Sequence, residues 1–109
     1  MSAPATTTTT SKPGWRPTPG LTIRRRVIVH GRVQGVFFRE TTRRRALERG
    51  VTGWVRNRRD GTVEAVFEGE PPAVEEMLRF SREGPEYASV EAVEVLEEEP
   101  VVEGSFEVR

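Results

Sequence analysis

The sequence of 109 residues contains no cysteine and a single histidine, His30. Without cysteine the chain has no disulfide, no thiolate metal site and no cysteine nucleophile. One imidazole also excludes a metal site built from several histidines. No apolar run approaches the roughly 20 residues that a membrane-spanning helix needs. The N-terminus lacks the apolar core of a secretory signal, and the Arg-rich amphipathic pattern of a transit peptide is scarce there. We therefore expect a cytoplasmic protein that does not bind a membrane.

Acidic residues are scarce in the first half of the chain, and basic residues are scarce in the second. Up to Asp60 there are fourteen basic and three acidic residues, and after it there are three basic and fourteen acidic ones. The totals are equal, so the formal net charge is zero. If the two halves interleave in one sheet, we expect a positive patch opposite a negative one.

The first twenty residues have a composition unlike that of the rest. They hold five consecutive threonines and four of the eight prolines, with no apolar period. Such a segment buries too little surface to offset the entropy that ordering costs. The length of the remainder suits one domain. We therefore predict a disordered tail over residues 1–20 and a single folded domain over residues 21–109.

Strand and helix patterns alternate through the predicted domain. Apolar residues at every second position predict strands over residues 23–30, 51–57, 62–68, 88–96 and 106–108. Helical spacing predicts helices over residues 40–49 and 71–83, which end at Gly50 and at Gly84-Pro85. Asp60-Gly61 is a strong hairpin signal between the second and third strands.

The order of these elements is β-α-β-β-α-β followed by a short extra strand. This order predicts a ferredoxin-like α/β sandwich, in which two helices cover one face of an antiparallel sheet. Right-handed crossovers would then bring the loop after the first strand next to the second strand.

That loop, between the first strand and the first helix, reads Gly31-Arg32-Val33-Gln34-Gly35-Val36-Phe37-Phe38-Arg39. Glycine lets the backbone turn through positive φ and lets a ligand come close. The N–H groups of such a loop can converge on an anion beside the positive end of the helix dipole. Arg39 would add a forked, permanently charged donor, so a phosphoryl group or another small oxyanion is the expected guest.

Each of these residues also has an ordinary structural interpretation. The glycine pair suits a simple turn, Arg39 suits the first turn of a helix, and Asn57 is a common turn former. His30 more readily finishes a strand than acts as a base. The residues become informative only in combination.

In combination, the run over residues 31–39 resembles the signature of the acylphosphatase family. Asn57 lies eighteen residues after Arg39 and closes Gly53-Trp54-Val55-Arg56-Asn57, which resembles the second signature of that family. Asp60-Gly61 and Gly84-Pro85 also fall where the family places its hairpin and the turn after its second helix. The resemblance covers residues 23–109.

The resemblance implies hydrolysis of an acyl phosphate to a carboxylate and inorganic phosphate, without a metal or another cofactor. Arg39 would be the catalytic arginine that binds the phosphate, and Asn57 would hold the attacking water. The phosphoryl oxygens would be wrapped by backbone amides, those of Gln34, Gly35, Val36, Phe37 and Phe38. The expected partners are a small acyl phosphate and phosphate or sulfate, not nucleic acid, and the expected state is a monomer.

Three alternatives remain at this point. The same fold builds RNA-binding modules, which stack bases on aromatic residues of the two central strands. Here the first strand offers none, and the third offers only Phe67, spaced as a core residue. The chain could instead be a non-catalytic anion-binding or regulatory domain. It could also be an accessory domain like the one that begins a hydrogenase-maturation protein, although an end at Arg109 without a Cys-rich extension favours a free-standing enzyme.

Overall fold

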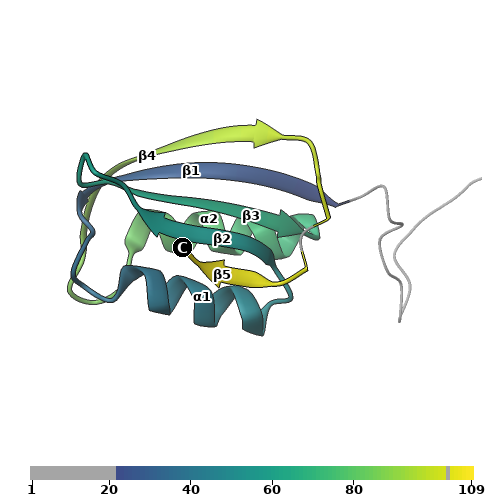
Figure 1. Cartoon of the computed structure of the whole chain (residues 1–109), viewed down its shortest axis with the longest axis horizontal. Helices are drawn as coiled ribbons and strands as arrows, with labels where there is room; N and C mark the ends of the chain where they lie inside the picture. The colour runs from purple at the N-terminus through teal and green to yellow at the C-terminus, as the bar shows by residue number, and fades with distance from the viewer. Residues whose placement is uncertain (1–21, 103) are drawn as a thin grey trace, which may run out of the picture.

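The computed structural model of the protein describes residues 22–102 and 104–109, so the tail predicted over residues 1–20 lies outside the described residues. Within these ranges the chain forms five strands and two helices (Figure 1). They are β1 (Ile23–Arg32), α1 (Phe38–Glu48), β2 (Thr52–Asn57), β3 (Val63–Gly69), α2 (Pro71–Glu83), β4 (Ser89–Glu98) and β5 (Phe106–Val108). The predicted order of elements and the ferredoxin-like fold are confirmed.

The strands form one sheet in the order β4-β1-β3-β2-β5. β1 pairs antiparallel with β3 and β4, and β2 pairs antiparallel with β3. β5 pairs in parallel with β2, so the sheet is mixed and the prediction of a wholly antiparallel sheet is corrected for this strand. The reason is the direction of β4, which runs opposite to β2 and therefore finishes at the end of the sheet where β2 starts. A short connection therefore starts β5 beside the start of β2.

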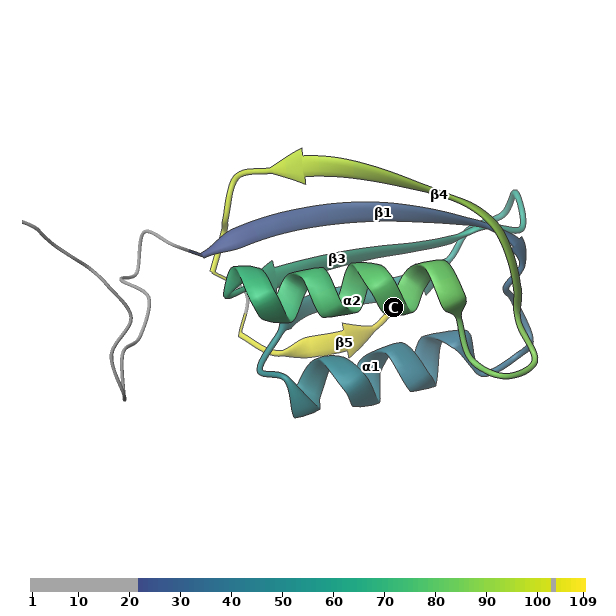
Figure 2. The same cartoon turned by 180° about the vertical axis from the view of Figure 1, so that it is seen from behind.

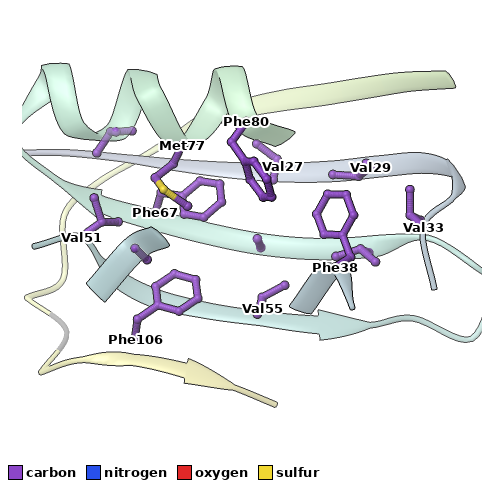
Figure 3. Close-up of a cluster of buried hydrophobic side chains, with 14 of the residues drawn as sticks. Val27, Val29, Val33, Phe38, Val51, Val55, Phe67, Met77, Phe80 and Phe106 are labelled. Carbon is purple, nitrogen blue, oxygen red and sulfur yellow. The ribbon is translucent and has the colours of Figure 1, made fainter. Parts of the chain in front are cut away.

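Both helices cover the same face of the sheet (Figure 2). The side chains between them and the sheet form the core, because alternate strand residues point to this face. The core includes Val63 and Val74. It also includes Val27, Val29, Val55, Phe67, Met77, Phe80 and Phe106, which Figure 3 labels. The rings of Phe38 and Phe80 lie 5.8 Å apart, and those of Phe67 and Phe106 stack at 5.9 Å. Burying each such side chain contributes roughly 1.5–3 kcal/mol, which fixes both helices on the sheet.

The other face of the sheet carries ion pairs between strands. Arg24 donates from Nη1 to Glu68 of β3 at 3.1 Å and from Nε to Glu98 of β4 at 3.0 Å. Arg26 pairs with Glu64 and Glu98 in the same way. The register places Arg24 directly opposite both Glu68 and Glu98. Arginines of the basic half are therefore neutralised here by glutamates of the acidic half, where the sequence predicted separate patches.

Trp54 lies on this second face and is 8% exposed. The guanidinium groups of Arg26, Arg56 and Arg109 lie 5.1–5.4 Å from the centre of its ring. Stacked cations of this kind stabilise an aromatic ring through its quadrupole. Trp54 therefore packs against the sheet under three arginine side chains.

Candidate active site

The direction of the strands gathers three chain segments at one end of the sheet. β1 and β2 are both antiparallel to β3, and β5 is parallel to β2, so β1, β2 and β5 all finish at this end of the sheet. Figure 1 shows the loop after β1 and the hairpin after β2 at the same end. The side-chain amide of Gln34 joins them, since its Nε2 donates to the carbonyl oxygens of Arg58 (2.7 Å) and Thr62 (2.9 Å). The predicted closeness of the first loop to the second strand is confirmed.

A cavity of about 380 Å³ opens at this end of the sheet. The β1–α1 loop and the first turn of α1 supply most of its lining, and single residues come from the ends of β2 and β5. The lining consists of Val33, Gly35, Phe37, Phe38, Arg39, Glu40, Asn57 and Val108. The two side chains predicted to be catalytic, Arg39 and Asn57, therefore border one cavity.

The loop backbone is shaped by two residues with positive φ. Gly35 has φ +75°, and apart from Gly35 and its two neighbours no atom of the described residues lies within 4 Å of the position that a Cβ would take there. Phe37, the N-cap of α1, has φ 65° and makes no side-chain capping bond. The first N–H groups of a helix have no acceptor within the helix, and they point from the positive end of its dipole. The start of α1 therefore leaves backbone donors beside the cavity, as anion binding requires.

Within the part of the chain that the structure describes, the side-chain donors of Arg39 and Asn57 are free. Across residues 22–102 and 104–109, the guanidinium of Arg39 forms no ion pair or hydrogen bond, and neither does the side-chain amide of Asn57. Arg43, one turn further along α1, instead pairs with Glu40 at 3.2 Å. A cation in the first turn is mildly disfavoured by the helix dipole, so an anion in the cavity would relieve the mismatch at Arg39.

The residues predicted to bind phosphate through their amides lie in two settings. Gly35, Phe37 and Phe38 line the cavity. The side chain of Val36 is buried, and that of Gln34 is committed to the hairpin. These two residues belong to the same turn, so their side chains hold the loop while their amides remain part of the predicted cradle.

Three residues of the lining were not predicted. Val33 and Glu40 lie within or beside the signature run, so proximity in sequence was a usable signal for them. Val108 had no such signal, because only the parallel pairing of β5 with β2 brings it to the cavity.

Two features of other protein classes do not occur in the described part of the chain. No group of three or more His, Cys, Asp or Glu side chains is placed to share a metal ion among residues 22–102 and 104–109. Neither α1 nor α2, the helices within these ranges, is long and apolar enough to cross a membrane.

Comparison with known proteins places the chain in a family. The family model described as acylphosphatase matches residues 25–108. An acylphosphatase of Rubrobacter xylanophilus is 63% identical over 90 residues, which cover 81% of each chain. One of Haloarcula marismortui is 57% identical over 86 residues, 79% of this chain and 94% of the relative. The solved structure of an acylphosphatase from Coxiella burnetii has a TM-score of 0.79 at 39% identity and covers 83% of this chain and 95% of that one. The chain belongs to the acylphosphatase family.

Proposed function

We propose that this protein is an acylphosphatase in which Arg39 and the loop amides hold the phosphoryl group while Asn57 orients the attacking water. The family membership and the named relatives support the activity, with a small acyl phosphate as substrate. One observation supports the residue roles: among the described residues the side chains of Arg39 and Asn57 have no partner, and both border the same cavity as the glycine loop.

The chemistry suits so small a set of side chains. Phosphoryl transfer mainly requires positioning of the groups and stabilisation of the charge on the equatorial oxygens. A guanidinium supplies a planar fork of donors for two of those oxygens, and the amides at the start of α1 supply others. This arrangement neutralises the phosphate with groups of the chain itself, so we propose that no metal is needed.

The leaving group and the nucleophile need little further help. A carboxylate is a weak base and departs without a general acid. The side-chain amide of Asn57 has both a donor and an acceptor with which to orient a water in line with the breaking P–O bond. The phosphate of the substrate then takes the proton that this water loses. Water thus adds to phosphorus while the acyl C–O–P bridge breaks on the phosphorus side.

The alternative of an RNA-binding module is not favoured by the open face of the sheet. On the central strands β1 and β3, the polar side chains of this face, among them Arg24 and Glu68, are engaged in ion pairs. Phe67 is fully buried beneath the helices, so β3 offers no exposed ring on which a base would stack.

Three further expectations stay predictions of the sequence. They are the location in the cytoplasm, the monomeric state, and the boundary between a tail over residues 1–20 and a domain over residues 21–109.

The activity is tested by phosphate release from benzoyl phosphate in the presence of a chelator. We expect turnover by the unchanged chain. Absence of phosphate release with and without added divalent cations would show that the proposed function is wrong.

The role of Asn57 is tested by Asn57→Ala. We expect turnover to fall roughly 10²–10³-fold, as for other preorganised donors, with inhibition by inorganic phosphate nearly retained. Arg56→Ala is the matched control, because neighbouring strand residues point to opposite faces and Arg56 pairs with Glu64 away from the cavity. Near-normal turnover of Asn57→Ala would contradict the water-positioning role.

A further inference from the structure

We propose that the side chains of Phe37 and Val108 form the subsite for the acyl group, which makes the enzyme selective for acyl phosphates with an apolar, above all aromatic, acyl group. This inference rests on the proposed function and adds the substrate class.

The first observation is the exposed ring of Phe37. Phe37 is 73% exposed although it lines the cavity. Within the described part of the chain, its ring contacts no other aromatic ring and no cation. Its backbone has φ 65°, a conformation that is unfavourable for a bulky residue and that glycine adopts easily. Packing within the chain therefore gives no reason for a phenylalanine here. Strained residues of this kind gather at ligand-binding sites.

The second observation is that Val108 is held firmly opposite the loop. It pairs with Val55 in the parallel ladder, and the next residue donates from Arg109 N to the carbonyl oxygen of Val55 at 2.8 Å. The connection that leads to β5 is held by Glu68, whose carboxylate accepts from the N–H groups of Val101 (3.0 Å) and Val102 (2.8 Å). Val108 is 40% exposed, so it presents an apolar surface at a fixed place on the cavity rim.

The third observation is the size of the cavity. At about 380 Å³ it falls in the range of roughly 300–1,000 Å³ typical of small-molecule sites, which is more than a phosphoryl group and one water require. The polar groups needed for them are Arg39, Asn57 and the loop amides. Most of the remaining lining is apolar and comes from Val33, Phe37, Phe38 and Val108. Sites for small molecules typically combine a few convergent polar groups with such apolar walls, so the spare volume suits the acyl group.

A ratio of substrates tests this inference. We would measure kcat/KM for benzoyl phosphate and for acetyl phosphate, and divide the benzoyl value by the acetyl value. The difference in leaving-group reactivity is the same for every variant, so a change in this ratio reports contacts to the acyl group. In Phe37→Ala we expect the ratio to fall roughly three- to tenfold, the range for losing one aromatic pair. In Val108→Ala we expect a fall of about two- to threefold, as for the loss of a smaller apolar contact.

Two matched variants separate the acyl contact from effects on the loop. Phe37→Tyr keeps an aromatic ring and should keep the ratio of the unchanged chain. Tyr87→Ala removes another highly exposed ring that does not line the cavity, and it should leave the ratio unchanged.

The outcomes distinguish this inference from the proposed function. If the unchanged chain hydrolyses neither substrate, both fail. If it hydrolyses both and Phe37→Ala keeps the ratio, or lowers both substrates by the same factor, the acyl subsite is wrong and the acylphosphatase activity stands. A fall in the ratio for Phe37→Ala and Val108→Ala but not for Tyr87→Ala supports the subsite.

Discussion

Replacement of Arg39 by alanine should lower activity without lowering stability. Arg39 borders the cavity and forms no ion pair within residues 22–102 and 104–109. Loss of one preorganised donor to a developing charge typically lowers turnover by roughly 10²–10³-fold, or about 2.7–4 kcal/mol. We expect a loss at the upper end of this range for kcat/KM, because Arg39 would contribute to phosphate binding as well as to turnover.

The expected effect on folding is different. Arg39 is a cation in the first turn of α1, and a cation there is unfavourable by about 0.3–1 kcal/mol. Among the described residues, no carboxylate loses a partner when the side chain of Arg39 is removed. We therefore expect the free energy of unfolding of Arg39→Ala to stay level or to rise slightly.

Two measurements on the same preparations check this prediction: phosphate release from benzoyl phosphate, and unfolding in urea followed by tryptophan fluorescence. Arg39→Lys keeps the charge and loses the planar fork of donors, so its activity should lie between that of the unchanged chain and that of Arg39→Ala. Arg43→Ala is the control within the same helix, since Arg43 pairs with Glu40 at 3.2 Å and lies outside the cavity lining. Arg43→Ala should change turnover little, because Arg43 lies outside the cavity. It should also change stability little, because exposed ion pairs contribute only about 0–1 kcal/mol.

Two results would refute this reasoning. One is that Arg39→Ala retains turnover within about threefold of the unchanged chain, far less than a preorganised donor contributes. The other is that its activity falls only in proportion to a loss of folded protein, which would make Arg39 a structural residue.

Two predictions concern stability. A Cβ at Gly53, where φ is +134°, would lie 1.9 Å from the carbonyl oxygen of Val66, so Gly53→Ala should lower the free energy of unfolding in urea by about 3 kcal/mol or more. Gly50 also has positive φ but has open space around it, so Gly50→Ala should lower the free energy of unfolding by only about 1–2 kcal/mol. Equal losses in the two variants would contradict the steric cause. Burial opposes ionisation of Glu64, but hydrogen bonds from Arg56 and Arg26 outweigh it and hold the pKa of Glu64 below its ordinary 4.5. The folded state then binds fewer protons than the unfolded state, so this contribution is complete above about pH 4.5 and is lost as pH falls through the lower folded pKa. Thermal unfolding between about pH 6 and pH 3 should show a smaller acid-induced fall in Tm for Glu64→Gln than for the unchanged chain, and parallel curves would refute the role of this carboxylate.

Local patterns were enough to predict the elements and the loop that lines the candidate site. Apolar alternation, the hairpin signal at Asp60-Gly61 and the stop at Gly84-Pro85 each report what a few neighbouring residues prefer. The loop from Gly31 to Arg39 is also continuous in sequence, so its glycines and its arginine could be interpreted together. These signals depend only on neighbouring residues, so they are present in the sequence whatever the tertiary structure.

The tertiary structure decided the contacts between distant segments that the order of elements does not specify. The pairing of Arg24 with Glu68 and Glu98 depends on the register of three strands, which the charge asymmetry of the sequence does not specify. Val108 reaches the cavity only because β4 finishes at the end of the sheet where β2 starts. β5 therefore starts beside the start of β2 and runs parallel to β2. Register and crossover direction are properties of the packed sheet, because one set of strand patterns permits several arrangements until the core selects one of them.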